Sequence, residues 1–287
     1  MKYFQQSLGK NNGTATFYLH EPSKEIDPNK KYPVMVVVPG GAYMWTSDRE
    51  AEPIASEFFA KDYHAVVVHY DTEGLEAYQG KEKNELPKNP VSVFPNPLVE
   101  LAEAISIVRK NAKEWAVDED RISVLGFSAG GNLAGLLGTY WTEDWLEELV
   151  GNKKSLYKPN YLVLAYAALD LITTSEESEV PVSLAITGNI NASKEKLRKV
   201  SPSYHVNEHT PPSFIWHTLE DTLVPANNAL KFATAMAEHN RPYELHIYEK
   251  GVHGVALGDS RTSRKENQSN KHAASWVNLL LGWLEAQ

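Results

Sequence analysis

The sequence predicts an α/β protein with a mostly parallel β-sheet that is covered by helices on both faces. Most of the predicted strands are continuous apolar runs, such as residues 33–38 and 64–70, as strands buried on both faces require. Segments with helical periodicity separate most of these runs. Such alternation is typical of parallel sheets, which bind ligands at the carboxyl ends of their strands.

The individual elements can be placed in chain order. Residues 2–8 and 14–20 flank Asn11-Asn12-Gly13, whose composition favours a turn, and together they predict an amino-terminal β-hairpin. Further strands are predicted over residues 33–38, 64–70, 122–127, 161–166, 212–217 and 243–248, with helices over residues 50–63, 98–115, 128–140, 226–239 and 273–284. Residues 71–97 are polar and contain several prolines, which predicts a long surface excursion of the kind that often carries binding residues.

We expect a single domain spanning residues 1–287, because no linker rich in proline, glycine or serine divides the chain. Within this domain, residues 171–210 have a mixed composition without a strong period. That stretch is interpreted as a small cap insertion over the sheet.

Composition restricts the partners that the protein could have. The formal net charge of -9 disfavours binding to nucleic acid or to an anionic membrane surface, so the expected partner is a small molecule. The absence of cysteine excludes disulfides, thiolate zinc sites and cysteine nucleophiles. The first residues lack the apolar core of a signal peptide, and no apolar run approaches about 18 residues, so a cytoplasmic protein is expected. The oligomeric state stays open between a monomer and a homo-oligomer.

The segment from Arg121 to Leu137, RISVLGFSAGGNLAGLL, carries the strongest chemical signal. Its apolar half predicts a strand, its second half has leucines at helical spacing, and Ser128 lies at the change. A serine on such a sharp turn needs strained backbone angles and very small neighbours, which Gly126, Ala129 and the glycines at 130–131 supply. The pattern is the G-x-S-x-G nucleophile elbow, and it makes Ser128 the candidate nucleophile.

A serine hydroxyl needs a base within hydrogen-bond reach, and that base needs an acidic partner to orient it. His253 is the candidate base among ten histidines, because it follows the last predicted strand and has a glycine two residues before it and one directly after it. Asp221 is the candidate acid, since it follows the penultimate strand; its rivals are the adjacent Glu220 and Asp170 at the end of an earlier strand. The alternative for Asp221 is a structural role as a helix cap or turn aspartate ahead of Pro225.

Acyl transfer also requires backbone donors for the oxyanion. The N–H of Ala129 would be one donor, and Gly41 and Ala42, which follow the strand at residues 33–38, would supply the other. Tyr43 and Trp45 come directly after this loop and are the candidate substrate-pocket residues, although simple packing explains such aromatics equally well. No metal ligands are predicted.

The chain resembles the α/β-hydrolase superfamily, and within it the acetyl esterase/carboxylesterase branch that includes acetyl-xylan-esterase-like and hormone-sensitive-lipase-like enzymes. The resemblance covers nearly the whole chain and rests on VVVPGGAY, DEDRISVLGFSAGGNLA, SPSYHVNEHTPPSFIWHTLEDTLVP and GVHG. The chain order Ser128, Asp221, His253 is the order of this superfamily. One departure is that Pro39 replaces the histidine, and Ala42 the third glycine, of the His-Gly-Gly-Gly motif that many hormone-sensitive-lipase-like members have.

This resemblance implies an eight-stranded, mostly parallel sheet and a cofactor-free serine esterase. The expected substrates are short acyl esters, such as acetyl esters of sugars or small alcohols, with rates that fall beyond about four acyl carbons. Two alternatives stay open at this stage. They are a serine peptidase or amidase of the same superfamily, and a non-catalytic small-molecule-binding protein with this fold.

Overall fold

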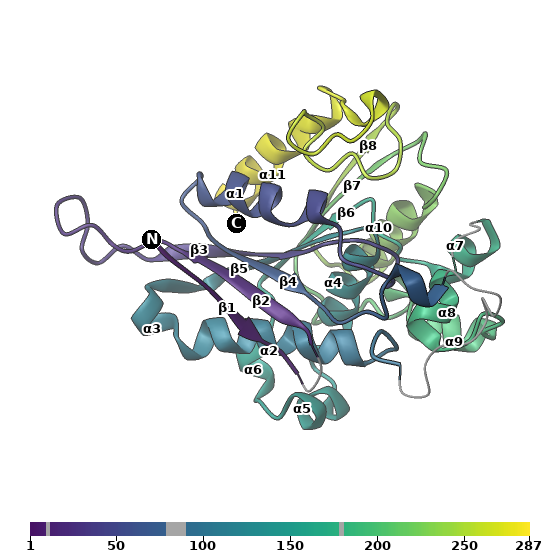
Figure 1. The fold of residues 1–287 in the computed structure, drawn as a ribbon, viewed down its shortest axis with the longest axis horizontal. Coiled ribbons are helices and arrows are strands. Elements are labelled where there is room, and N and C mark those ends of the chain that lie inside the picture. The colour runs from purple at the N-terminus through teal and green to yellow at the C-terminus, as the bar shows by residue number, and fades with distance from the viewer. Residues whose placement is uncertain (10–11, 79–89, 178–180) are drawn as a thin grey trace.

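The computed structural model describes residues 1–9, 12–78, 90–177 and 181–287, and its centre is one eight-stranded sheet with the strand order β1-β2-β4-β3-β5-β6-β7-β8 (Figure 1). The strands are β1 (Lys2–Ser7), β2 (Thr14–Leu19), β3 (Tyr32–Val38), β4 (His64–His69), β5 (Val117–Phe127), β6 (Tyr161–Ala165), β7 (Ser213–Thr218) and β8 (Tyr243–Tyr248). Strand β2 pairs antiparallel with both β1 and β4, and the remaining pairs are parallel. The predicted α/β class and mostly parallel sheet are confirmed.

Helices cover both faces of this sheet because successive side chains of a strand point in opposite directions. Val34 and Val36 of β3 contribute to one hydrophobic cluster, which contains α2 (Asn96–Lys110), α4 (Ser128–Tyr140) and α10 (Asn227–Glu238). Met35 and Val37 contribute to the other cluster, with α1 (Glu52–Phe59) and α11 (Trp276–Glu285). A strand that is buried on both sides must be apolar throughout, as all seven residues of β3 are.

Strand β5 begins five residues earlier than predicted. Tyr32 of β3 pairs with Val117, the register then shifts, and Val34 pairs with Ile122. The intervening residues, Asp118 to Arg121, are charged and partly or fully exposed, so their sequence gives no signal of a buried strand. An irregular pairing of this kind is set by the neighbouring strand rather than by local periodicity.

Several helices differ from the predicted ranges. The predicted helix over 98–115 is divided at Asn111 into α2 and α3 (Ala112–Trp115), and α1 is preceded by the 3₁₀ turn η1 (Asp48–Glu50). Two short helices, α5 (Asp144–Val150) and α6 (Lys154–Tyr157), lie outside the predicted helix ranges. Short 3₁₀ turns lie at η2 (Leu75–Tyr78), η3 (Pro202–Tyr204), η4 (Glu266–Gln268) and η5 (Ala273–Ser275).

The segment predicted as an insertion contains α7 (Leu171–Glu177), α8 (Val182–Thr187) and α9 (Lys194–Lys199), which lie together at the right of Figure 1. Leu171, Leu184 and Leu197 are buried in the same cluster as α2 and α4, so these helices are packed onto the domain. Residues 178–180 of this segment, 79–89 of the predicted surface excursion and Asn11 of the predicted turn lie outside the described residues. Within the described ranges, no helix is both long and apolar enough to cross a membrane.

Candidate active site at the carboxyl end of the sheet

The turn from β5 into α4 places Ser128 at the carboxyl end of the sheet. Ser128 has a φ of 52°, a left-handed conformation that costs free energy for a residue with a side chain. The turn is tight enough that a Cβ on Gly126 would lie 2.2 Å from the carbonyl oxygen of Gly130, and one on Gly130 would lie 2.1 Å from that of Val38. Only glycine fits at these two positions, as the elbow pattern predicts.

Ser128, His253 and Asp221 meet at this edge although they are far apart in the chain. Ser128 Oγ lies 2.9 Å from His253 Nε2, and His253 Nδ1 lies 2.6 Å from Asp221 Oδ2. Both distances are in the range of hydrogen bonds. With Nδ1 donating to the carboxylate, Nε2 is free to accept the serine proton, which is the arrangement that general-base activation of a serine requires.

Asp221 is fully buried and fixed from several sides. Its Oδ1 accepts the N–H groups of Leu223 and Val224, both at 2.9 Å, and the Nε2 of His217 lies 3.3 Å from its Oδ2. Burial alone would raise the pKa of Asp221, but hydrogen bonds from His217 and His253 outweigh it and hold the pKa well below its usual range. The carboxylate therefore stays ionised and can stabilise a protonated His253.

The loop after β3 brings backbone N–H groups close to Ser128. Gly41, Ala42 and Tyr43 all have positive φ values, of 127°, 54° and 62°. Among the described contacts, the N–H groups of Gly41 and Ala42 have no acceptor within the chain, and a Cβ on the preceding Gly40 would lie 2.9 Å from Ser128 Cβ. These N–H groups are available to a ligand beside the serine, as an oxyanion hole would need.

A small pocket of about 30 Å³ lies next to Ser128. Its lining is largely apolar, and the segment 171–210 contributes two of its residues: the wall consists of Ala42, Ser128, Ala129, Ala168, Thr174, Val182, Leu223 and Val224. Tyr43, predicted to shape this pocket, is only 1% exposed, and its hydroxyl donates to Asn132 Oδ1 at 2.6 Å. Tyr43 is thus part of the core beneath the loop, whereas Trp45 is 38% exposed beside it.

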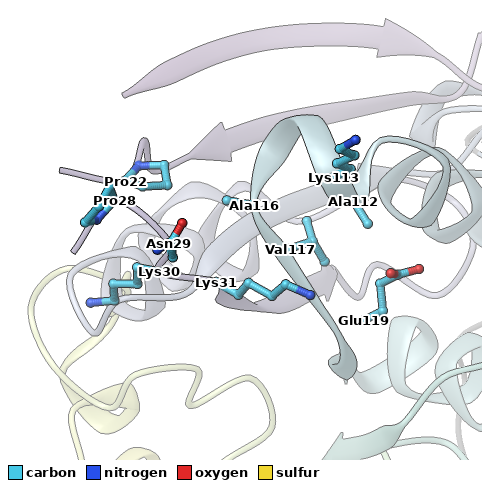
Figure 2. Close-up of a pocket in the computed structure, with 10 residues that line it drawn as sticks. All are labelled: Pro22, Pro28, Asn29, Lys30, Lys31, Ala112, Lys113, Ala116, Val117 and Glu119. Carbon is cyan, nitrogen blue, oxygen red and sulfur yellow. The ribbon is translucent and has the colours of Figure 1, made fainter. Parts of the chain in front are cut away.

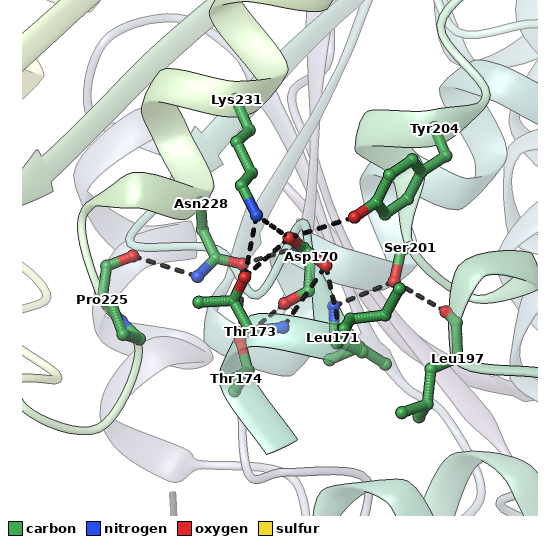
Figure 3. A network of polar contacts seen from close by, with 11 residues as sticks. Asp170, Leu171, Thr173, Thr174, Leu197, Ser201, Tyr204, Pro225, Asn228 and Lys231 are labelled. Carbon is green, nitrogen blue, oxygen red and sulfur yellow. Dashed lines mark hydrogen bonds and ion pairs between the residues drawn. The ribbon is translucent and has the colours of Figure 1, made fainter. Parts of the chain in front are cut away.

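The two rival acids have other partners. Asp170 accepts hydrogen bonds from Thr173 and Tyr204, forms an ion pair with Lys231, and accepts the N–H of Ile172 at the start of α7 (Figure 3). Glu220 accepts the N–H of Gly251 and binds Lys250. Asp170 therefore anchors α7 to α10, and Glu220 fixes the loop that carries His253.

A second pocket, of about 280 Å³, lies at the opposite edge of the sheet, where β3 and β5 begin (Figure 2). Lys30, Lys31, Lys113 and Glu119 contribute its charged side chains, and its lining contains no serine or histidine. Over the described part of the chain, no three histidine, aspartate or glutamate side chains converge as a metal site would require. The candidate nucleophile Ser128 and the candidate base His253 meet at the carboxyl edge of the sheet.

Sequence reasoning missed two residues next to this site, His217 and Glu50. His217 is predicted only as the last residue of the strand over 212–217, but its Nε2 is 2.8 Å from the carbonyl oxygen of Val224 and 3.3 Å from Asp221 Oδ2. Glu50 is predicted only as the first residue of the helix over 50–63, yet it is 4% exposed and accepts the Gly40 N–H at 2.9 Å. The role of Glu50 has no local sequence signal, since it depends on contacts with Gly40 and Tyr166 in separate segments. His217 lies only four residues before Asp221, and that spacing is a local signal that could have identified it.

The family model BD-FAE matches residues 19–236, which is most of the chain. The chain belongs to this family. The carboxylesterase Cest-2923 of Lactobacillus plantarum is 28% identical and superimposes with a TM-score of 0.84, covering 100% of this chain and 98% of that one. An acetyl ester-xyloside bifunctional hydrolase of Caldicellulosiruptor lactoaceticus is also 28% identical, with a TM-score of 0.75 over 97% of this chain and 89% of the other. These neighbours place the chain in the esterase branch of the α/β-hydrolases.

One relative is a much longer protein than this chain. Endo-1,4-beta-xylanase B of Butyrivibrio fibrisolvens is 28% identical over 242 residues, which amount to 84% of this chain but 34% of the xylanase. The chain thus spans about a third of that protein's length.

Proposed function

We propose that this protein is a serine carboxylesterase that hydrolyses short-chain acyl esters, with Ser128, His253 and Asp221 as its catalytic triad. The observation that carries the proposal is the continuous hydrogen-bonded relay from Ser128 Oγ through the His253 ring to Asp221. The same relay generates a nucleophile from a serine on unrelated folds. Membership of the BD-FAE family supports the proposal independently.

The reaction takes place in two halves. Ser128 Oγ attacks the ester carbonyl carbon while His253 Nε2 accepts its proton, and the backbone N–H groups of Gly41, Ala42 and Ala129 bind the oxyanion. The tetrahedral intermediate collapses as His253 returns the proton to the departing alcohol. Water then attacks the acyl-enzyme by the same route and releases the acid. Asp221 orients the imidazole and stabilises its charged form in both halves.

The small pocket beside Ser128 favours an acetyl group. A cavity must offer about 10–15 Å³ to hold one water molecule. A pocket of about 30 Å³ therefore has room for about two chemical groups of the size of a water molecule. Longer acyl chains would have to displace Thr174, Val182 or Leu223 from the wall. We therefore propose acetyl esters as the preferred acyl class.

For the alcohol we propose sugars or small alcohols. Trp45 is the exposed aromatic residue beside the Gly41–Ala42 loop, and an indole face can pack on the apolar face of a sugar ring. The acetyl ester-xyloside hydrolase named above supports this choice, since its name pairs an acetyl ester with a sugar.

The direct test measures the hydrolysis of p-nitrophenyl esters of increasing acyl length by the wild type and by Ser128→Ala. We expect the highest kcat/KM on the acetate, a decline beyond about four acyl carbons, and no measurable turnover by the variant at a nearly unchanged melting temperature. Comparing kcat/KM on acetylated xylose with kcat/KM on simple alkyl acetates then tests which alcohol the enzyme prefers. Residual turnover by Ser128→Ala, or equal rates on long-chain esters, would contradict the proposal.

A further inference from the structure

Glu50 is a buried carboxylate that the proposed reaction does not use. It lies in the turn η1, between the loop at residues 39–45 and helix α1, and only 4% of it is exposed. Burying a carboxylate is costly unless its oxygens have hydrogen-bond partners. The partners of Glu50 therefore indicate what the chain gains from placing it there.

One oxygen of Glu50 fixes the loop that carries the oxyanion donors. Oε2 accepts the N–H of Gly40 at 2.9 Å, and the carbonyl of Gly40 accepts the N–H of Ser47 at 3.0 Å. In a trans peptide the C=O and the following N–H point in opposite directions. Holding the Gly40 carbonyl consequently sets the direction of the Gly41 N–H, which is one of the proposed donors.

The other oxygen of Glu50 reaches the loop that carries His253. Oε1 accepts the Tyr166 hydroxyl at 2.6 Å, and the same hydroxyl oxygen accepts the N–H of Ala256 at 3.2 Å. The Tyr166 ring also packs edge-on against the His253 ring, with centroids 5.2 Å apart. Burial holds the pKa of Tyr166 well above its ordinary value, so the hydroxyl keeps the proton that it donates.

The adjacent Arg49 joins the same two regions, because its guanidinium donates to the carbonyl oxygens of Gly254 and Thr262. We infer that Glu50, acting through Gly40 and Tyr166, is a positioning residue that holds the oxyanion loop and the histidine loop in register with Ser128. The inference rests on the proposed esterase function and adds to it a residue that touches no substrate.

The test compares Glu50→Ala, Glu50→Gln and Tyr166→Phe with a matched control, Glu100→Ala. Glu100 is also a buried glutamate that accepts a backbone N–H, from Asp71, but it lies on α2 on the other face of the sheet. Each variant is assayed for kcat and KM on p-nitrophenyl acetate. Hydrogen exchange of residues 40–45 and 251–257 reports on the two loops without depending on turnover.

We expect Glu50→Ala to lower kcat about 100-fold with KM within about twofold, because donors misplaced by about 1 Å lose transition-state binding only. Glu50→Gln keeps an acceptor for Gly40 and should recover at least about tenfold of that loss. Tyr166→Phe removes the hydrogen bond to Glu50 and the one from Ala256, and it should lower kcat about tenfold. Glu50→Ala should also increase exchange in both loops, whereas Glu100→Ala should leave kcat unchanged.

A folded Glu50→Ala variant with wild-type kcat and wild-type exchange would overturn the inference, as would a loss confined to KM or an equal loss of kcat in Glu100→Ala. If Glu50→Ala does not fold, Tyr166→Phe decides in the same way: a lowered kcat supports the inference and a wild-type kcat overturns it. Failure of the esterase proposal looks different, because turnover would then be absent from the wild type or unaffected by Ser128→Ala, while hydrogen exchange would still report on the two loops.

Discussion

At the scale of single residues, the environment of Asp221 distinguishes it from the other acids near the sheet edge. Its two carboxylate oxygens have different hydrogen-bond partners: Oδ1 accepts the N–H groups of Leu223 and Val224, and Oδ2 accepts from His253 Nδ1. Asp170 is equally buried but is engaged by Lys231 and by the start of α7 (Figure 3). Two aspartates with similar burial thus have different roles, which their partners decide.

This difference predicts the outcome of two conservative substitutions. Asp221→Asn should lower kcat about 10⁴-fold, because an amide that donates to His253 Nδ1 selects the tautomer that cannot accept the Ser128 proton. Asp170→Asn should leave kcat nearly unchanged and lower the melting temperature, since it weakens the ion pair with Lys231. Steady-state kinetics and thermal unfolding of both variants provide the measurement, and a larger loss of kcat in Asp170→Asn would reassign the acid.

At the scale of elements, the close contact between strand β3 and helix α4 positions Ser128, the proposed nucleophile. The turn at Phe127–Ser128 brings the start of α4 against the end of β3, and a Cβ on Gly130 would lie 2.1 Å from the carbonyl oxygen of Val38 and 2.4 Å from that of Pro39. Both obstacles are backbone atoms, which cannot rotate away as a flexible side chain could. The elbow therefore depends on the absence of a side chain at this position.

We accordingly expect Gly130→Ala to destabilise the fold by about 3 kcal/mol or more, at the upper end of overpacking costs, and to abolish esterase activity. Gly282→Ala is the control: Gly282 also lies in a helix, α11, but no atom lies within 4 Å of a Cβ placed there. The control should gain about 0.5–1 kcal/mol, because alanine loses less backbone entropy than glycine in a helix. Urea unfolding of both variants measures their free energies of unfolding. Equal changes in the two variants would show that the contact between β3 and α4 leaves room for a Cβ at position 130.

At the scale of the whole molecule, Glu100 connects the amino-terminal hairpin to the rest of the domain. It is 2% exposed on α2, its Oε2 accepts the N–H of Asp71, and its carboxyl would meet a Cβ on Gly13 at 2.7 Å. Burial raises its pKa to about 7. Between about pH 4.5 and pH 7, Glu100 is therefore protonated in the folded state but ionised in the unfolded state. This difference contributes stability at low pH, and the contribution is lost as the pH rises through 7.

Glu100→Gln, which imitates the neutral acid, should become more stable relative to the wild type as the pH rises from 5 to 8, by up to about 3 kcal/mol. His64, whose pKa burial lowers to about 4, changes stability in the opposite sense between about pH 4 and pH 6.5. The contribution of His64 is the same in the wild type and in Glu100→Gln. The informative quantity is therefore the difference between the free energies of unfolding of these two proteins. A difference that does not change with pH would mean that Glu100 is solvated in the folded protein.

Much of the fold was readable from the sequence because both faces of the sheet are buried. Continuous apolar runs placed β3, β4 and β6 within one or two residues, and the glycines around Ser128 identified the turn into α4. The bulge before Ile122 and the short helices α5 and α6 were missed, since charged or mixed residues carry no period there.

The sequence by itself determined the alternation of strands and helices and the candidates Ser128, Asp221 and His253, because apolar periodicity, turn composition and motif spacing are local properties of the sequence. The tertiary structure alone decided which acid faces the histidine, that Tyr43 is packed in the core, and that Glu50 contacts the loops around the site. These contacts join segments from different strands and loops, and their geometry exists only once the sheet has brought the carboxyl ends of its strands together.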